Sequence, residues 1–157
     1  MKKIYSLIFL IILSTSIISC GYQLRNAQEI NFDSISINGG SSGFIKILKK
    51  KFKQSGIQID SEDSELILDI VNDIFSKKIL SLSSSGKVKE YQIIYKVSFR
   101  TKQKNTAWSS PITIETMRDY TYDDKNINAK TKEEARLIIG MQEQLIRRMV
   151  TQISVSK

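Results

Sequence analysis

The chain has 157 residues, with 24 lysines and arginines against 16 aspartates and glutamates, a formal net charge of +8 at pH 7 and no histidine. The missing histidine removes the commonest general base at neutral pH and the commonest metal ligand, so histidine-based triads and zinc sites are excluded. A single cysteine allows no disulfide within the chain, and no Gly-Lys-Ser/Thr phosphate loop is present.

The N-terminal segment has the layout of a secretory signal. Two lysines precede an apolar stretch, residues 4–13, which gives way to hydroxylated residues before Cys20. A spanning helix needs about 20 apolar residues, and this stretch is shorter, so a simple signal anchor is disfavoured. The small residue directly before the cysteine and the aliphatic one three positions before it resemble the lipobox of bacterial lipoproteins, in which the thiol is acylated. We therefore predict a lipoprotein signal peptide over residues 1–19 and a mature chain held at a membrane by acyl chains on Cys20.

The mature residues 20–157 have the length of one domain, with 22 basic and 16 acidic side chains. A basic exported domain suggests an anionic partner, such as lipid phosphate or an acidic protein surface. The alternative is that the lysine excess only keeps a small domain soluble. Nucleic acid is not expected as a partner, because the chain is exported.

The mature chain opens with a strand and an amphipathic helix. Alternation over residues 30–37 predicts the strand, and apolar side chains at helical spacing predict a helix over residues 44–53. Ser41 or Ser42 is a suitable N-cap for this helix, and Gly56 a suitable C-terminal stop. Five lysines occupy the remaining positions of the helix, either as its solvated side or as a surface for anionic head groups.

Several β segments follow. We expect a short strand over residues 57–59 and a long hairpin formed by residues 65–82 and 87–101 around a serine-rich turn. At about 3.3 Å per residue the second arm would extend roughly 50 Å, longer than most globular sheets need. One face of this arm carries Tyr91, Ile93, Tyr95, Val97 and Phe99. A further strand over residues 108–122 is interrupted by Pro111, which indicates an edge or a bulge.

The last predicted element is a helix over residues 130–155, with Thr131 as a candidate cap and an i, i+4 pair between Glu143 and Arg147. Its expected buried stripe consists of Ile138, Met141, Leu145, Met149 and Ile153. Two helices with one apolar face each pack most economically on one side of a sheet. We therefore predict an α+β fold, with two helices packed on one face of a mainly antiparallel, roughly four-stranded sheet.

Catalysis is not expected from the remaining acidic groups. The adjacent carboxylates at positions 123–124 and 133–134 point apart on a strand or a helix, so neither pair converges on a substrate. No cofactor or metal is expected either.

Motifs in consistent order along the mature chain carry a family resemblance. They are the Cys20-Gly21-Tyr22-Gln23-Leu24-Arg25 start, the Lys-rich helix before Gly56-Ile57, Glu90-Tyr91-Gln92, Arg118-Asp119-Tyr120 and Glu143-Gln144-Leu145-Ile146-Arg147-Arg148. In these features the chain resembles the LPS-assembly lipoprotein family LptE. The resemblance implies a non-enzymatic outer-membrane lipoprotein on the periplasmic side. Such a protein plugs the lumen of the large β-barrel LptD, helps that barrel assemble, and binds lipopolysaccharide for delivery to the outer leaflet.

The resemblance also implies basic residues that contact lipopolysaccharide near one end of the sheet. Lys130 matches one such position of the family. The other falls in the serine-rich turn, where this chain has Ser84; Lys87 and Lys89 lie a few positions on and could compensate, and Arg118 is a further candidate. A different class of function left open by the sequence is an auxiliary periplasmic lipoprotein of an ABC-type lipid transporter.

Overall fold

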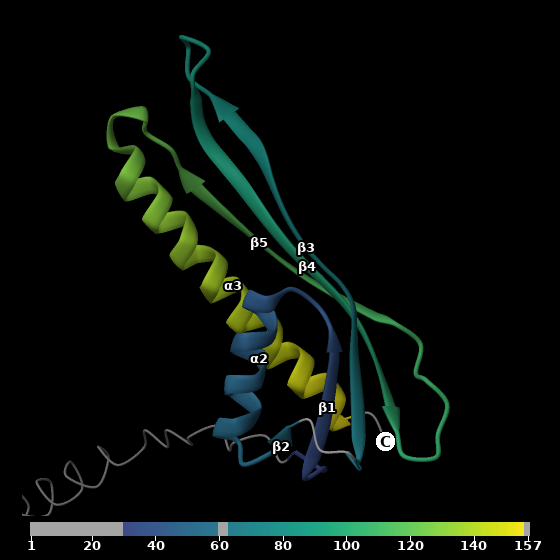
Figure 1. Cartoon of the computed structure of the whole chain (residues 1–157). Coiled ribbons are helices and arrows are strands. Elements are labelled where there is room, and N and C mark those ends of the chain that lie inside the picture. Colours follow the sequence, from purple (N-terminus) through teal and green to yellow (C-terminus); the bar gives the residue numbers. More distant parts are fainter. Residues whose placement is uncertain (1–29, 60–62, 156–157) are drawn as a thin grey trace, which may run out of the picture.

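The computed structural model describes residues 30–59 and 63–155, so the predicted signal peptide and Cys20 lie outside the described residues (Figure 1). Five strands form one sheet in the order β2-β1-β3-β4-β5. The elements are β1 (Ser34–Gly39), α2 (Ser42–Gln54), β2 (Gln58–Ile59), β3 (Leu66–Leu82), β4 (Val88–Gln103), β5 (Ile112–Thr121) and α3 (Ile127–Val155). In the described part of the chain, no helix is both long and apolar enough to cross a membrane.

The long hairpin is the dominant feature of the sheet. Strands β3 and β4 have 17 and 16 residues and pair antiparallel, as predicted, and β5 pairs antiparallel with β4. Strand β1 pairs parallel with β2 and, between Leu66 and Ile70, with β3. The outer part of β3 therefore has a neighbouring strand on the β4 side only. Together with β5, which pairs with β4 as far as Glu90, the hairpin extends as an arm beyond β1 and β2 (Figure 1).

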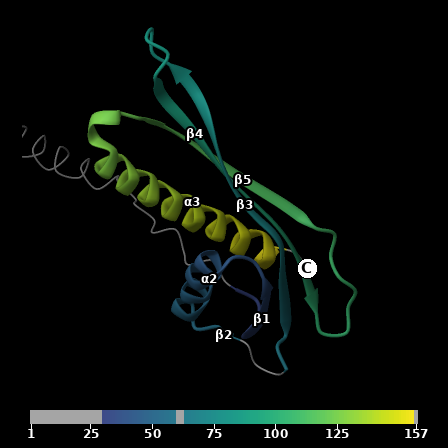
Figure 2. The ribbon, with the colours of Figure 1, turned by 45° about the horizontal axis from the view of Figure 1, so that its top comes forward.

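Both helices lie on the same face of the sheet, with α2 beside the C-terminal half of α3 (Figure 2). The predicted face of β4 is turned toward them, and Ile93, Tyr95, Val97 and Phe99 are buried there. Helix α3 contributes Met141, Leu145, Ile146, Met149, Val150 and Ile153 to the same core, and α2 contributes Phe44, Leu48 and Phe52. The predicted α+β fold is confirmed. Its sheet has five strands because the two-residue β2 joins it, and it is mixed because β1 pairs in parallel.

Local signals at the ends of α2 were partly misleading. Gly56 has a positive φ of 80°, as its predicted role as a helix stop requires. Ser41 has the extended conformation of an N-cap, but its hydroxyl makes no capping hydrogen bond. It donates instead to the Asp73 carboxylate at 2.5 Å, which ties the start of α2 to the middle of β3.

The C-terminal elements begin at different residues from those predicted. Helix α3 starts at Ile127, so Thr131 is no cap; its hydroxyl lies inside the helix and donates to the Ile127 carbonyl at 3.0 Å. Asp123 instead caps the 3-10 turn (Asp124–Asn126) that leads into α3. Strand β5 starts at Ile112, directly after Pro111, so the predicted strand over residues 108–122 was too long at its beginning. Strand β5 lies at the edge of the sheet, as Pro111 predicted.

Candidate functional site

Three elements meet at the far end of the hairpin. The β3–β4 turn, the end of β5 and the first turns of α3 lie together there, and we call this end the tip region (Figure 1). The backbone N–H of Tyr122 donates to the Lys89 carbonyl at 2.9 Å, and the Lys87 ammonium lies 3.6 Å from the Asp124 carboxylate. Backbone and side-chain contacts thus join the hairpin to the segment that leads into α3.

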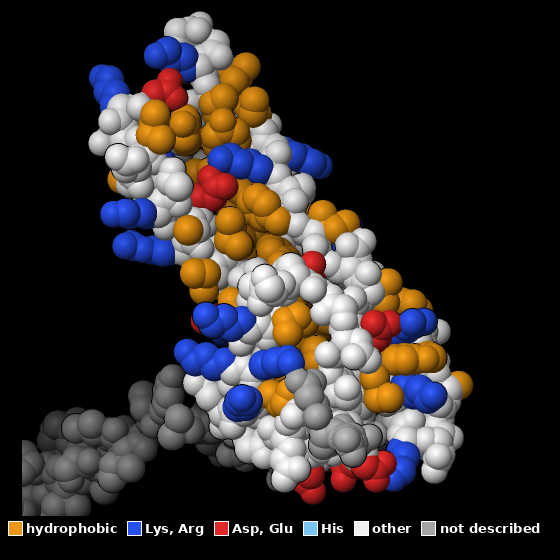
Figure 3. Space-filling view, viewed as in Figure 1, with side chains coloured by type: hydrophobic (Ala, Val, Ile, Leu, Met, Phe, Trp, Pro, Cys, Tyr) orange, Lys and Arg blue, Asp and Glu red, His pale blue; other side chains and the backbone are white. Residues whose placement is uncertain are grey.

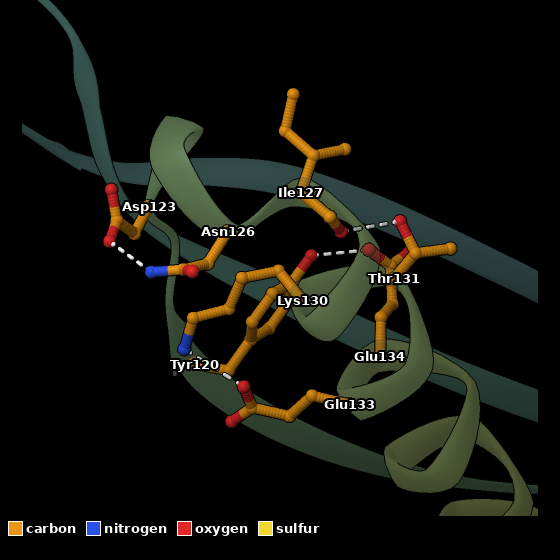
Figure 4. A network of polar contacts seen from close by, with 8 residues as sticks. All are labelled: Tyr120, Asp123, Asn126, Ile127, Lys130, Thr131, Glu133 and Glu134. Atoms are coloured by element: carbon orange, nitrogen blue, oxygen red, sulfur yellow. Dashed lines mark hydrogen bonds and ion pairs between the residues drawn. The ribbon is translucent and has the colours of Figure 1, made fainter.

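The structure brings three of the four predicted lipopolysaccharide-binding candidates to this region. Lys87 is in the hairpin turn with a side chain 71% exposed, and Lys89 is exposed at the start of β4. Lys130 belongs to the first turns of α3, and its ammonium is 2.8 Å from the Glu133 carboxylate (Figure 4). The ammonium of Lys89 forms no ion pair with another residue that the structure describes. The tip region therefore presents cations from two elements that are far apart in sequence.

Arg118, the fourth candidate, lies outside the tip region and has local partners. Its guanidinium donates to the Gln144 side-chain oxygen at 2.7 Å and to the Met117 carbonyl at 2.8 Å. It pairs across the sheet with Ile93, four strand positions from Lys89, which corresponds to about 13 Å along the strand. This arginine holds β5 against the middle of α3.

A lysine that the sequence analysis did not single out occupies the helix-facing side of the arm. The Lys77 ammonium lies 2.6 Å from the Glu134 carboxylate and 4.1 Å from the centre of the Tyr91 ring. Tyr120 and Tyr122 complete the aromatic surroundings, with their ring centres 5.5 Å and 6.0 Å from the same ammonium. No sequence pattern predicts this cluster, because it joins β3, β4, β5 and α3 through long-range pairing.

The cluster is held by charge-assisted hydrogen bonds. The Tyr120 hydroxyl donates to the same Glu134 carboxylate (Figure 4). Partial burial opposes ionisation of Glu134, yet hydrogen bonds from Lys77 and Tyr120 lower the pKa of this carboxyl below its ordinary value. Burial likewise favours neutral Lys77, but the bonds to Glu134 and Tyr120 raise the pKa of its ammonium. Burial and then the hydrogen bond to the Glu134 carboxylate raise the pKa of Tyr120. Lys77 is therefore a fixed, neutralised cation that positions the tip region.

Apolar side chains accompany the cations. Leu80, Leu82 and Ile127 are 48%, 56% and 54% exposed at this end of the molecule. Lys87 and Lys89 lie within a few residues of the two leucines along the hairpin. Exposed ammonium groups beside exposed aliphatic groups suit a ligand that carries phosphates next to acyl chains.

Comparison with protein families agrees with this architecture. The family LptE, described as lipopolysaccharide-assembly, matches residues 19–153. The chain belongs to this family. The resemblance predicted from the motifs is confirmed, and the chain is a lipoprotein-family member involved in lipopolysaccharide assembly. The family is not enzymatic, so the expectation of a non-catalytic protein is confirmed as well.

Solved structures of lipoproteins share the fold. Lipoprotein B from Nitrosomonas europaea, solved by NMR and described as uncharacterized, is 28% identical, with a TM-score of 0.71 over 85% of this chain and 90% of that one. Rare lipoprotein B from Shewanella oneidensis is 24% identical, with a TM-score of 0.67 over 76% of this chain and 92% of that one. A minor lipoprotein from Acinetobacter baumannii is 19% identical, with a TM-score of 0.64 over 80% and 93%. No curated protein matches the chain.

Proposed function

We propose that this LptE-family member is an outer-membrane lipoprotein that receives lipopolysaccharide at its tip region. The observation that carries the proposal is the convergence of Lys87, Lys89 and Lys130 beside exposed aliphatic side chains, in a chain whose family acts in lipopolysaccharide assembly. Acyl chains on Cys20 would hold the domain at the periplasmic side of the outer membrane.

The ion pairs of the tip region can be exchanged for phosphate. Lys87 and Asp124 are 71% and 52% exposed and 3.6 Å apart, and such exposed pairs stabilise a protein by about 0 to 1 kcal/mol. A phosphate group with three acceptor oxygens would compete well for this ammonium. The Lys89 ammonium is not paired with a carboxylate of the described residues, so phosphate would displace no such partner there. Lys130 is less accessible, with a side chain 21% exposed, so it would contribute mainly to the positive potential of the surface.

We further propose that the domain plugs and assists assembly of a large β-barrel partner, LptD. A narrow arm supported along one face by α3 has the shape of an element that fills a lumen, and its length exceeds what its own core needs (Figure 1). The exposed aliphatic side chains along the arm support a buried position in a larger assembly.

Affinity purification of the full-length, lipidated chain from membranes tests this function. We expect a large outer-membrane β-barrel and lipopolysaccharide to co-purify in mild detergent, and depletion of the protein to reduce lipopolysaccharide at the cell surface. Recovery with the inner membrane and an ABC transporter, with surface lipopolysaccharide unchanged, would refute the proposal in favour of the transporter-associated role.

A further inference from the structure

The outer part of β3 has an open edge. Strand β1 accompanies β3 only as far as Ile70, and no other strand of the described residues pairs with β3 on that side over residues 71–79. A β-bulge lies at each end of this stretch, between Ile70 and Asn72 and between Ile79 and Ser81. At about 3.3 Å per residue, this open edge extends roughly 30 Å.

The backbone groups along this edge are directed away from the sheet. The Lys104 N–H donates to the Glu65 carbonyl, and the Tyr122 N–H donates to the Lys89 carbonyl. The backbone N–H and C=O groups of even-numbered β4 residues are therefore directed to β3, and those of odd-numbered residues to β5. Along a β-strand, the backbone N–H and C=O groups of successive residues are directed alternately to the neighbouring strand on one side and on the other. With the observed register, the backbone groups directed to the open edge are those of Asp73, Phe75, Lys77 and Ile79.

Apolar side chains flank the same edge on both faces of the sheet. Phe75 and Ile79 lie opposite Tyr95 and Tyr91 on the helix-facing side, whereas Ile74 lies opposite Lys96 on the other. The exposed fractions of Val71, Ile74, Phe75 and Ile79 are 52%, 46%, 39% and 58%. Figure 3 shows apolar side chains gathered along the arm. Proteins usually protect such edges, because a row of unpaired backbone groups with apolar flanks accepts another strand.

The charge of Lys78 distinguishes between two possible partners for this edge, the same edge of a second copy and a segment of a different polypeptide. Lys78 lies on the face without helices, is exposed, and forms no ion pair with another described residue. The open edge of a second copy would offer on this face only Asn72, Ile74, Ser76 and Lys78, none of which is acidic. On the other face, Asp73 and Lys77 already have partners, Ser41 and Glu134 respectively. A second copy therefore leaves Lys78 without a countercharge, whereas a different polypeptide with a carboxylate at that position supplies one.

We propose that residues 71–79 of β3 pair with an extended segment of another polypeptide. This segment carries apolar side chains on both faces and an aspartate or glutamate opposite Lys78. Its own backbone must be unpaired, so it is a loop or an edge strand and not the closed wall of a barrel, where neighbouring strands already satisfy every backbone group. The inference deepens the proposed function and rests on it for the compartment, the outer membrane, in which the partner is sought.

Amide hydrogen exchange on the lipidated, full-length chain tests the pairing. Exchange is measured for the chain retained in its outer-membrane complex in mild detergent and for the same chain separated from its partners. We expect the amides of Asp73, Phe75, Lys77 and Ile79 to exchange at least about tenfold more slowly in the complex. Equal exchange in the two samples overturns the inference.

Substitutions at one position separate backbone pairing from contact through side chains. Ile79→Ala and Ile79→Pro remove the same exposed side chain, but only proline removes the outward N–H, and an edge position tolerates it. We expect Ile79→Pro to lower recovery of the complex at least about tenfold relative to Ile79→Ala, and Lys78→Glu to lower it relative to Lys78→Gln. Equal recovery within both pairs of variants overturns the inference and indicates cover by acyl chains or by side-chain contact.

Further measurements make each result decisive. Thermal unfolding must show that Ile79→Pro folds, and if it does not, the Lys78 pair of variants and the exchange data decide the question. A dimer of the chain that protects this edge overturns the inference in favour of a second copy. A chain that fails to bind lipopolysaccharide while its edge amides are protected refutes the proposed function alone. Lipopolysaccharide binding without edge protection refutes the inference alone.

Discussion

The ion pair between Lys77 and Glu134 connects the arm to α3, and its energy is a direct test of how the tip region is held. The two charged atoms are 2.6 Å apart, and their side chains are 31% and 21% exposed. A hydrogen bond between charged groups stabilises a protein by about 1.5 to 3 kcal/mol, and partial exposure to water reduces that value. We expect a coupling free energy of about 1 to 2 kcal/mol between these two side chains.

A double-mutant cycle measures this coupling. Urea unfolding is followed for the mature domain, for Lys77→Met, for Glu134→Gln and for the double variant. Glutamine keeps an acceptor for the Tyr120 hydroxyl, so the cycle isolates the charge interaction with the lysine. A coupling free energy below about 0.3 kcal/mol is within the error of additivity. Such a value would refute the conclusion that this ion pair holds the arm against α3.

The pH dependence of the same variants provides an independent check. Glu134 has a pKa lowered from its ordinary 4.5, so its contribution to the unfolding free energy is fully present above pH 4.5 and is lost as the pH falls through the folded-state pKa. Lys77 has a pKa raised from 10.5, so its contribution is present below pH 10.5 and is lost as the pH rises through the folded-state value. We expect Glu134→Gln to flatten the acid side of the stability profile. An unchanged acid slope would contradict the role of this carboxylate.

Other substitutions test the fold and the limits of the site. Gly39→Ala should lower the unfolding free energy by about 2 kcal/mol or more in urea titrations, because φ is 72° there and a Cβ would lie 2.3 Å from the Ile70 carbonyl oxygen; an unchanged midpoint would contradict this. Leu145→Ala should cost about 2 to 5 kcal/mol because the side chain is fully buried in the core, and a loss below 1 kcal/mol would show that the core relaxes around the cavity. Arg118→Gln should lower the melting temperature through its lost bond to Gln144 but leave lipopolysaccharide affinity unchanged, so a selective loss of binding would return Arg118 to the site.

The sequence was sufficient for the elements whose side chains alternate between two clear environments. Strand β4 shows this best, because Ile93, Tyr95, Val97 and Phe99 are apolar at every second position and all are buried. The lysines of α2 were equally informative, because they leave Phe44, Leu48 and Phe52 as one buried stripe. Periodicity sufficed for both elements, since each has a single buried face.

Features set by long-range pairing could not be predicted in the same way. The contact of Lys77 with Glu134 depends on the register of β3 against β4, which shifts at the bulges, and on the angle at which α3 crosses the sheet. The start of α3 was missed because Asp123 caps a 3-10 turn ahead of it, and residues 126–128 include two asparagines that favour turns over helix. The placement of Lys87 beside Asp124 likewise depends on the tertiary fold.

Lipopolysaccharide binding by two charge-matched variants tests the proposed role of the tip region most directly. One variant replaces Lys87, Lys89 and Lys130 with glutamine. The other replaces three exposed lysines of α2 with glutamine, namely Lys46, Lys50 and Lys53. Both lose three charges, and binding of purified lipopolysaccharide to each is measured at low and at high salt. We predict that the tip variant binds lipopolysaccharide at least about tenfold more weakly than the parent chain at low salt, with a smaller difference at high salt. The affinity of the α2 variant should stay close to that of the parent chain. Equal losses in the two variants, or a larger loss in the α2 variant, would contradict binding at the tip region.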